Sequence, residues 1–281
     1  MSSAAFIGIL KWVALCYGGL LALLYFGQGY LIFAPWAVAA PSFDGHPLRP
    51  AFEQAQAQTQ DGLDLAFWHA APQEGKPVIV FFHGNAIHAL QGIQRAAFFH
   101  QAGYGFVMAE YRGYGGNKGR PTEQGLYQDA RAVINKVKVL YPDAPLVMYG
   151  ESIGTGVAVQ MATEFPAEFP AAAVVLEAPY TSITDVGRAQ YPIFPVALLL
   201  RHKFESDTKI TEIHNAPLLI IHGTRDTIVP YRLGRGLYER AAEPKFFLEV
   251  DGAGHNDLHA HNILPRIEAF LSNKGEGGPS E

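Results

Sequence analysis

The chain has 281 residues, of which 49% are hydrophobic and 17% are charged, and its formal net charge is −5. This length suits one large α/β domain with an appendage, and the high apolar content excludes a globally disordered chain. The negative net charge argues against nucleic acid as a partner, and the single cysteine, Cys16, excludes disulfides and thiolate metal clusters within the chain.

The chain begins with a long apolar segment, which has no charged side chain between residues 12 and 33. As a helix, this stretch would be about 33 Å long, close to the roughly 30 Å hydrocarbon core of a bilayer. Lys11 precedes it. Aromatic residues gather toward its other end, where a membrane interface is expected: Tyr25, Tyr30 and Trp36. We predict a single-pass membrane anchor over residues 1–35 and a linker over residues 36–50.

Two other interpretations of this segment are left open. A cleaved secretory signal is also apolar, and residues 37–39 resemble a small-residue cleavage site, although the apolar run is longer than a usual signal core. A buried helix of the soluble part is the third interpretation. Lys11 and Arg49 flank the apolar segment on opposite sides, so the orientation in the membrane is not fixed by the flanking charges.

The residues that follow predict strands alternating with helices. Residues 52–60 and 63–70 are expected to form a hairpin around the turn at Asp61-Gly62. Apolar runs predict buried strands at residues 78–82, 106–110, 146–149, 173–176, 218–221 and 246–250. Helices are predicted at residues 88–102, 122–140 with Thr122 as N-cap, 156–162, 231–242 and 263–271. This alternation indicates an α/β domain over residues 51–272, with a mostly parallel sheet covered on both faces. Residues 273–281 are predicted to be a disordered tail.

One strand runs directly into a serine turn, Gly150-Glu151-Ser152-Ile153-Gly154. A strand, a tight turn around a serine and a helix are the context in which Gly-x-Ser-x-Gly exposes a serine hydroxyl at the sheet edge. Both glycines are needed because a side chain there would collide with a neighbouring strand or helix. The alternative is an ordinary strand-to-helix turn that contains a serine. We predict Ser152 as a nucleophile.

A serine hydroxyl needs a base, and the base needs an acid that orients it. In such sheets ligands bind at the carboxyl ends of the strands, so we expect the partners of Ser152 there. Asp226 follows the predicted strand at residues 218–221, and His255 follows the one at residues 246–250. The order serine, aspartate, histidine is that of an α/β-hydrolase. The alternatives are a turn-capping aspartate and a solvated loop histidine.

The reaction also needs an oxyanion hole made of two fixed N–H groups. Ile153 supplies one backbone N–H because it directly follows the serine. The second is expected from the loop after the strand at residues 78–82, at Asn85, with Ala86 as second choice. The alternative is that His83-Gly84 forms only a tight turn.

Other histidines are not assigned to the catalytic site. His222 lies one residue beyond its strand and is interpreted as buried and hydrogen-bonded. His259 and His261 are expected on a surface helix, and no carboxylate or cysteine spacing supports a metal site that would join them to His255. We therefore predict no metal and no cofactor.

Together these motifs resemble the α/β-hydrolase superfamily, and within it the membrane-anchored Bem46-like, ABHD17-like and ABHD13-like serine hydrolases. The resemblance is carried by residues 82–86, 111–115, 119–123, 150–156, 222–230 and 252–257. It implies Ser152 as nucleophile, Asp226 as acid and His255 as base. It also implies that residues 31–35 are retained, which argues against a cleaved signal.

The chain departs from these relatives at two places. Asn117 stands where many relatives have serine, which is expected to affect loop packing and not the triad. Some relatives carry an N-terminal cysteine cluster for lipidation, whereas this chain has only Cys16. Depalmitoylating activity is therefore not carried over from the resemblance.

Residues 180–215 are expected to form a cap, and they include the apolar run 192–200. An apolar cap beside the serine suggests a pocket for an acyl chain or another apolar group. The alternative is a helix that simply packs on the sheet. Arg112 and Arg120 are expected to pair with carboxylates and not with substrate.

The sequence thus predicts a membrane-tethered serine hydrolase that cleaves an ester, thioester or related acyl bond through an acyl-enzyme intermediate. Its substrate would be a small or lipid-like acyl compound. A serine peptidase of related fold would need an acidic rim for a peptide amine, and none is clear. A non-catalytic membrane-associated scaffold would need a broken triad. The natural substrate and the oligomeric state are left open.

Overall fold

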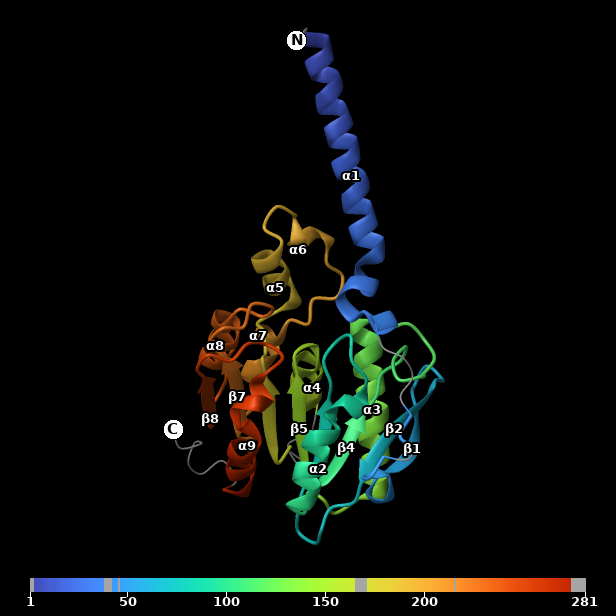
Figure 1. The fold of residues 1–281 in the computed structure, drawn as a ribbon, viewed down its shortest axis with the longest axis vertical. Coiled ribbons are helices and arrows are strands. Elements are labelled where there is room, and N and C mark those ends of the chain that lie inside the picture. Colours follow the sequence, from blue (N-terminus) through green and yellow to red (C-terminus); the bar gives the residue numbers. More distant parts are fainter. Residues whose placement is uncertain (1–2, 38–41, 45, 165–170, 215, 274–281) are drawn as a thin grey trace.

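The computed structural model describes residues 3–37, 42–44, 46–164, 171–214 and 216–273. A long N-terminal helix stands on an α/β domain (Figure 1). Part of the predicted linker, at residues 38–41 and 45, and the predicted tail from residue 274 onward lie outside the described residues.

In this part of the chain an eight-stranded sheet runs in the order β1-β2-β4-β3-β5-β6-β7-β8. β1 (Glu53–Gln58) and β2 (Asp64–Ala70) form the predicted antiparallel hairpin, and β2 is also antiparallel to β4. The other neighbours are parallel: β3 (Val78–Phe82), β4 (Gly105–Ala109), β5 (Leu146–Glu151), β6 (Ala173–Glu177), β7 (Leu218–Gly223) and β8 (Lys245–Val250). The prediction of a mostly parallel sheet is confirmed.

The central strands are continuous apolar runs because both faces of the sheet are covered. Every residue of β3 is buried. Val80 and Phe82 point into one core cluster, and Ile79 and Phe81 point into the other, as the two-residue period of a strand requires. The sheet therefore separates two apolar layers, one under each set of helices.

Helices cover both faces of the sheet, as predicted (Figure 1). α3 (Glu123–Leu140), α4 (Ile153–Glu164) and α8 (Tyr231–Arg240) pack on one core cluster, and α2 (Ile93–Gln101) and α9 (Ile263–Ser272) pack on the other. Thr122 is the N-cap of α3, since its side chain accepts a hydrogen bond from the N–H of Gly125. The prediction of one helix over residues 88–102 is wrong in its first turn. A 3₁₀ helix, Ala89–Gly92, precedes α2, and Gly92 lies close against the ring of Phe81.

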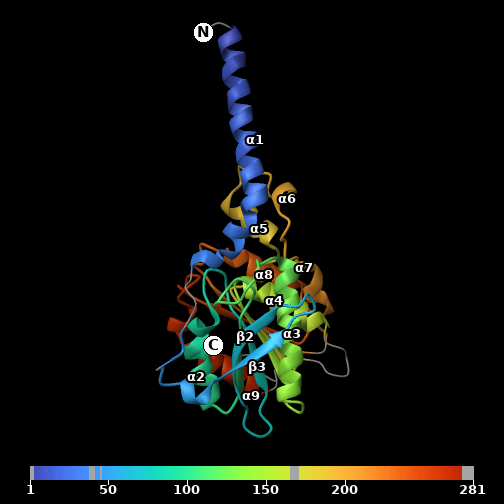
Figure 2. The same ribbon diagram turned by 90° about the vertical axis from the view of Figure 1, so that its right-hand side faces the viewer.

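In its described residues the predicted cap contains three short α-helices between β6 and β7. They are α5 (Ile183–Gln190), α6 (Val196–Leu199) and α7 (Ser206–Lys209). α5 and α6 rise above the sheet beside the base of the N-terminal helix, and the two views agree on this (Figure 1, Figure 2). The cap therefore lies over the carboxyl ends of the parallel strands, next to the first helix of the chain.

The N-terminal helix α1 (Ser3–Phe33) changes character along its length. Over residues 5–33 it is long and apolar enough to cross a membrane, and its most apolar stretch is not buried in the protein. This exposure rules out a buried helix of the domain, the third interpretation above. Its C-terminal end is different, because Phe33 is fully buried and its ring packs against Phe204. The last turns of α1 are thus part of the domain.

Candidate active site

Ser152 lies in the sharp turn between β5 and α4. Its φ of 51° is in the left-handed region, which is rare for a residue other than glycine. Its N–H donates to the carbonyl oxygen of Glu177 at 2.9 Å, and its own carbonyl oxygen accepts from Thr155. These bonds hold the strained turn in place from both sides.

The two glycines of the motif are needed for close packing. A Cβ at Gly150 would collide with the backbone of Gly154, and a Cβ at Gly154 would collide with the carbonyl oxygen of Phe82 at the end of β3. The predicted reason for both glycines is therefore confirmed. The turn can lie on the neighbouring strand only because these side chains are absent.

Three residues far apart in the sequence meet at the carboxyl ends of the strands. His255 Nε2 lies 3.0 Å from Ser152 Oγ, and His255 Nδ1 lies 2.7 Å from Asp226 Oδ2. Asp226 follows β7 and His255 follows β8, as expected. The other carboxylate oxygen of Asp226 accepts from the N–H groups of Ile228 and Val229. Asp226 thus also caps a turn, which fixes the direction of its carboxylate.

His222 also contacts the carboxylate of Asp226. Its ring is fully buried, and its Nε2 lies 2.9 Å from the carbonyl oxygen of Val229 and 3.3 Å from Asp226 Oδ2. Burial alone would raise the pKa of Asp226, but hydrogen bonds from His222 and His255 outweigh it and hold this pKa below its ordinary value. His222 matches its interpretation as a buried histidine. His259 and His261 lie exposed in a 3₁₀ helix.

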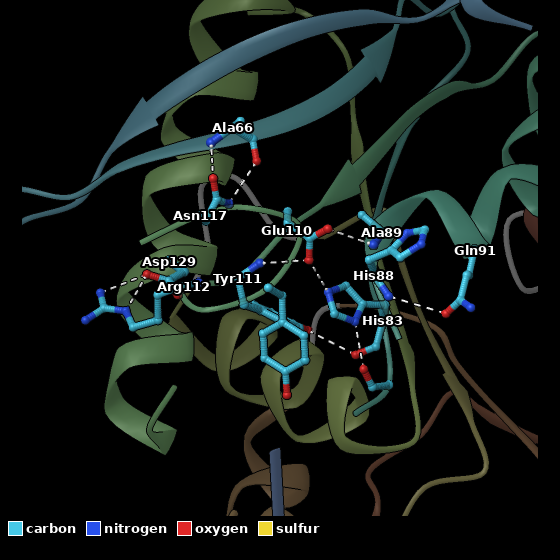
Figure 3. Close-up of polar contacts among 12 residues, drawn as sticks. Ala66, His83, His88, Ala89, Gln91, Glu110, Tyr111, Arg112, Asn117 and Asp129 are labelled. Atoms are coloured by element: carbon cyan, nitrogen blue, oxygen red, sulfur yellow. Dashed lines mark hydrogen bonds and ion pairs between the residues drawn. The ribbon is translucent and has the colours of Figure 1, made fainter. Parts of the chain in front are cut away.

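The loop after β3 is pinned by a buried carboxylate that sequence reasoning missed (Figure 3). Glu110 Oε1 lies 2.8 Å from His83 Nε2, and Glu110 Oε2 accepts from the N–H of Ala89 at 2.9 Å. His83 Nδ1 faces the carbonyl oxygen of Gly84 at 2.7 Å. One side chain at the end of β4 therefore holds both ends of the loop.

The predicted oxyanion donors, Asn85 and Ile153, lie beside Ser152 in one cavity. Within the described residues, neither backbone N–H has a hydrogen-bond acceptor. The second choice for a donor, Ala86, has its N–H bonded to the carbonyl oxygen of Phe33 at 3.3 Å. The geometry therefore favours Asn85 over Ala86. The loop lies close to Ser152, since a Cβ at Gly84 would be 3.4 Å from Ser152 Cβ, which is van der Waals contact.

A cavity of about 580 Å³ extends from Ser152 toward α1 and the cap. No charged side chain is among the described residues that line it. Its apolar wall comes from α4, α5, α6, the loops near them and α1: Leu24, Leu31, Ile32, Ile153, Tyr180, Ile183, Val186, Tyr191, Phe194, Val196, Leu199, Leu200, Ile228 and Val229. The cap thus forms a pocket wall, which was one of the two interpretations of its sequence.

A buried glutamine joins α1 to the cap, and sequence reasoning missed it. Gln28 is 4% exposed and lines the cavity. Its Nε2 donates to the carbonyl oxygen of Leu199 at 3.0 Å, and its Oε1 accepts from the N–H of Arg201 at 2.7 Å. Asn85 Nδ2 in turn donates to the carbonyl oxygen of Ile32. The end of α1 is therefore bonded both to the cap and to the loop that carries Asn85.

A second buried charge network lies under the serine turn. Arg95 on α2 contacts Glu177 at 2.8 Å and Glu151 at 3.3 Å. Tyr149 donates to Glu177 at 2.7 Å, and the backbone oxygen of Glu177 holds the N–H of Ser152. This network ties α2, β5 and β6 together next to the turn that carries Ser152.

Two residues noted in the sequence have structural contacts. Asn117 makes two hydrogen bonds to the backbone of Ala66, at 2.8 and 3.1 Å, so it packs a loop on β2 as expected (Figure 3). Arg112 pairs with Asp129 and Asp61 and does not line the cavity. The hydrogen bond from Arg112 is the largest influence that lowers the pKa of Asp61, to about 2.

Comparisons with known proteins agree with this fold. A family described as serine aminopeptidase S33 matches residues 73–205. An uncharacterized protein of Mycobacterium tuberculosis is 37% identical over 268 residues, which cover 92% of each chain. Human alpha/beta hydrolase domain-containing protein 17B is 33% identical, over 80% of this chain and 76% of its own length. Rat lysophosphatidylserine lipase ABHD12 is 29% identical, over 78% of this chain and 66% of its own length.

Solved structures share the architecture at low sequence identity. An esterase of Pyrococcus furiosus has a TM-score of 0.68 at 18% identity, covering 84% of this chain and 95% of its own. An esterase of Exiguobacterium antarcticum has a TM-score of 0.61 at 14% identity, covering 78% of this chain and all of its own. The predicted fold class is confirmed by these likenesses.

Proposed function

The chain belongs to the α/β-hydrolase superfamily, and from this premise we propose that it is a serine hydrolase of carboxylic esters, thioesters or related acyl bonds. The observation that carries the proposal is the hydrogen-bonded series Ser152, His255 and Asp226, with distances of 3.0 and 2.7 Å. A hydroxyl, an imidazole and a carboxylate in this order are what acyl transfer to serine requires.

In the proposed mechanism Ser152 Oγ attacks the carbonyl carbon while His255 Nε2 takes the hydroxyl proton. Asp226 stays ionised and stabilises the imidazolium. The N–H groups of Ile153 and Asn85 bind the oxyanion, each contributing about 3 kcal/mol to transition-state stabilisation. His255 then gives its proton to the leaving oxygen or sulfur, and the acyl-enzyme forms. Water, deprotonated by the same imidazole, releases the acid and restores Ser152.

The chemistry of the cavity supports an apolar acyl chain as the group that is bound. A largely apolar wall stabilises hydrocarbon, and the described residues that line it include no carboxylate to pair with a free amine. An aminopeptidase, which is what the matching family is described as, would need such a partner. We therefore favour an ester or thioester of a lipid-like acid, and the name of the lysophosphatidylserine lipase relative points to the same class.

We further propose that α1 anchors the protein in a membrane. Its length and apolar surface support this. The proposed anchor is not a separable tether, since Phe33 and Gln28 are built into the domain. The anchor predicted over residues 1–35 and the domain predicted over residues 51–272 therefore both contribute residues to the wall of the cavity.

The test is hydrolysis by the full chain in detergent micelles of p-nitrophenyl esters and acyl-thioesters of increasing chain length. We expect turnover that rises with chain length and falls by at least about 10³-fold in Ser152→Ala. Aminoacyl p-nitroanilides serve as the comparison for peptidase activity. Equal turnover by Ser152→Ala would refute the proposed nucleophile. Absence of turnover on every ester would favour the non-catalytic scaffold, and preference for the anilides would favour the peptidase.

A further inference from the structure

We propose that the tip of the cap, defined as residues 191–200, is inserted in the acyl-chain layer of the membrane that α1 enters. This inference rests on the proposed anchor, and it extends the proposed function by naming where the substrate enters. The insertion would bring the cavity into contact with the lipid phase.

The cap tip has the composition of a membrane-inserted loop. It carries no charged side chain, while Arg188 and Arg201 stand on its two sides. Three of its apolar side chains are largely exposed, Tyr191 by 61%, Ile193 by 76% and Leu198 by 83%. A cluster of exposed apolar groups bounded by polar residues marks a contact with a membrane or another protein.

The cap tip lies along α1, and this contact favours the membrane over another protein as the partner of the exposed apolar side chains. The hydroxyl of Tyr17 donates to the carbonyl oxygen of Ile193 at 3.1 Å, and the rings of Tyr17 and Phe194 are stacked. Nearer the domain, Gln28 bonds to Leu199. Figure 1 and Figure 2 both show α5 and α6 beside the lower part of α1. The tip therefore follows α1 for about 17 Å, the rise of the residues between Gln28 and Tyr17.

The length of α1 places this contact within the hydrocarbon. About 20 residues are needed to cross the roughly 30 Å core of a bilayer. Within the described residues the apolar span of α1 begins at Ala5, so its part beyond the contact at Tyr17 is residues 5–16, which are about 18 Å long. If α1 crosses the membrane, the level of Tyr17 is inside the apolar layer. The cap tip, which is bonded to Tyr17, must then be there too.

Arg201, the charged residue that follows the cap tip, lies at the level expected for the lipid headgroups. Twenty residues counted from Ala5 end at Leu24, so Tyr25 falls at the boundary of the hydrocarbon. The guanidinium of Arg201 lies over the ring of Tyr25, 5.2 Å from its centroid. A tyrosine and an arginine at this level are suited to the headgroup region. Lys11 lies six residues from Ala5, about 9 Å along the helix, so its long side chain would have to extend toward the opposite interface.

Part of the cavity wall lies at the same depth as the cap tip. Leu24 on α1 and Tyr191 and Phe194 in the cap tip belong to its wall, and Ser152 lies at its other end. An acyl chain would pass from the bilayer between α1 and the tip without crossing water. The preferred substrate would thus be an acyl ester or thioester in the membrane. The same compound in a micelle or free in water would be hydrolysed more slowly.

The depth of the cap tip is measured on the full chain in phospholipid vesicles. With Cys16→Ser as background, a nitroxide is attached to Ile193→Cys, Leu198→Cys or Val139→Cys. Val139 is the matched control, because it is 74% exposed and lies in the last turn of α3. The other end of α3 faces the cap, since Glu123 in its first turn is hydrogen-bonded to Lys203. Val139 is therefore at the end of α3 away from the cap. We expect labels at residues 193 and 198 to collide mainly with oxygen, which partitions into lipid, and the label at 139 mainly with a water-soluble nickel chelate.

Two results would overturn the inference. Labels at residues 193 and 198 that meet the nickel chelate as often as the label at 139 would place the tip in water. Labels shielded from both reagents would mean that protein covers the tip, such as a second copy of the chain. This measurement does not depend on catalysis, so it separates failure of the inference from failure of the proposed hydrolase activity.

An activity measurement gives a second readout. Ile193→Asp and Leu198→Asp should lower hydrolysis of a long-chain ester embedded in vesicles by about tenfold, the equivalent of one lost buried leucine. Hydrolysis of soluble p-nitrophenyl acetate should stay unchanged, and Val139→Asp should alter neither rate. Equal losses on both substrates, or no loss on the embedded ester, would contradict membrane insertion of the tip.

Discussion

The floor and the roof of the cavity are built by different physical means. The floor carries the groups that we propose to react, and buried carboxylates hold it at the strand ends: Asp226 contacts His255, Glu110 contacts His83 and Glu177 contacts Arg95. The roof consists of α1 and the cap, which meet through apolar contacts and a few hydrogen bonds at Gln28 and Tyr17. The contrast suggests that the floor fixes the chemistry, whereas the roof selects the acyl group and can adjust to it.

The largest expected effect is on the floor. Asp226→Asn keeps the shape of the side chain but removes the charge that stabilises the imidazolium in the proposed mechanism, so kcat should fall by about 10⁴-fold. The loss should be the same for short and long esters, because the roof is unchanged. Steady-state kinetics on both substrates measure it, with the exposed Asp64→Asn as control. A loss confined to long esters would contradict the division between floor and roof.

The next effect is on stability. Arg95→Met leaves Glu177 buried without its cationic partner, which should lower the free energy of unfolding by about 3–5 kcal/mol. Denaturant titration in detergent compares it with Arg188→Met, whose ion pair is exposed and worth less than about 1 kcal/mol. Similar midpoints for the two variants would show that the network under Ser152 does not hold the floor.

A smaller effect is expected on the roof. Gln28→Leu removes the partners of Leu199 and Arg201, a cost of about 1–3 kcal/mol. Because these bonds position the wall and not the proposed triad, the ratio of kcat/KM for a long ester to that for a short ester should fall about tenfold. The control is Gln54→Leu, on the exposed face of β1. An equal fall for both esters would assign Gln28 to the floor.

The smallest effect concerns pH and lies outside the cavity. Asp61 has a folded pKa of about 2, below its ordinary 3.8, so the unfolded chain binds more protons between these values. Its pairing with Arg112 therefore stabilises the fold fully above about pH 4, and this contribution is lost as the pH falls toward 2. Asp61→Asn should flatten the acid limb of the stability curve slightly. An unchanged acid limb would contradict the pairing.

The sequence identified what local patterns determine. The strand before Ser152 is a continuous apolar run, and the two glycines that flank Ser152 can be recognised without information from distant residues. Asp226 and His255 were predictable because each follows an apolar strand, and parallel strands bring their carboxyl ends to one edge. The N-cap at Thr122 is local in the same way.

Contacts between distant segments were not predictable. Glu110 looks like the end of a strand, and nothing near it indicates that it will face His83, 27 residues earlier. Gln28 is one polar residue in an apolar helix, and its partners lie 171 and 173 residues away. The uniform apolar pattern of α1 predicted a membrane anchor, but it could not show which end becomes a wall of the cavity.

The most direct test of the central claim is mass spectrometry of the full chain after brief exposure to a slowly hydrolysed acyl ester and an acid quench. The account predicts an acyl group on Ser152 in the wild type, no acyl group at this position in Ser152→Ala, and little in His255→Ala, because the hydroxyl then lacks its base. An acyl group on another residue, with hydrolysis intact in Ser152→Ala, would contradict it.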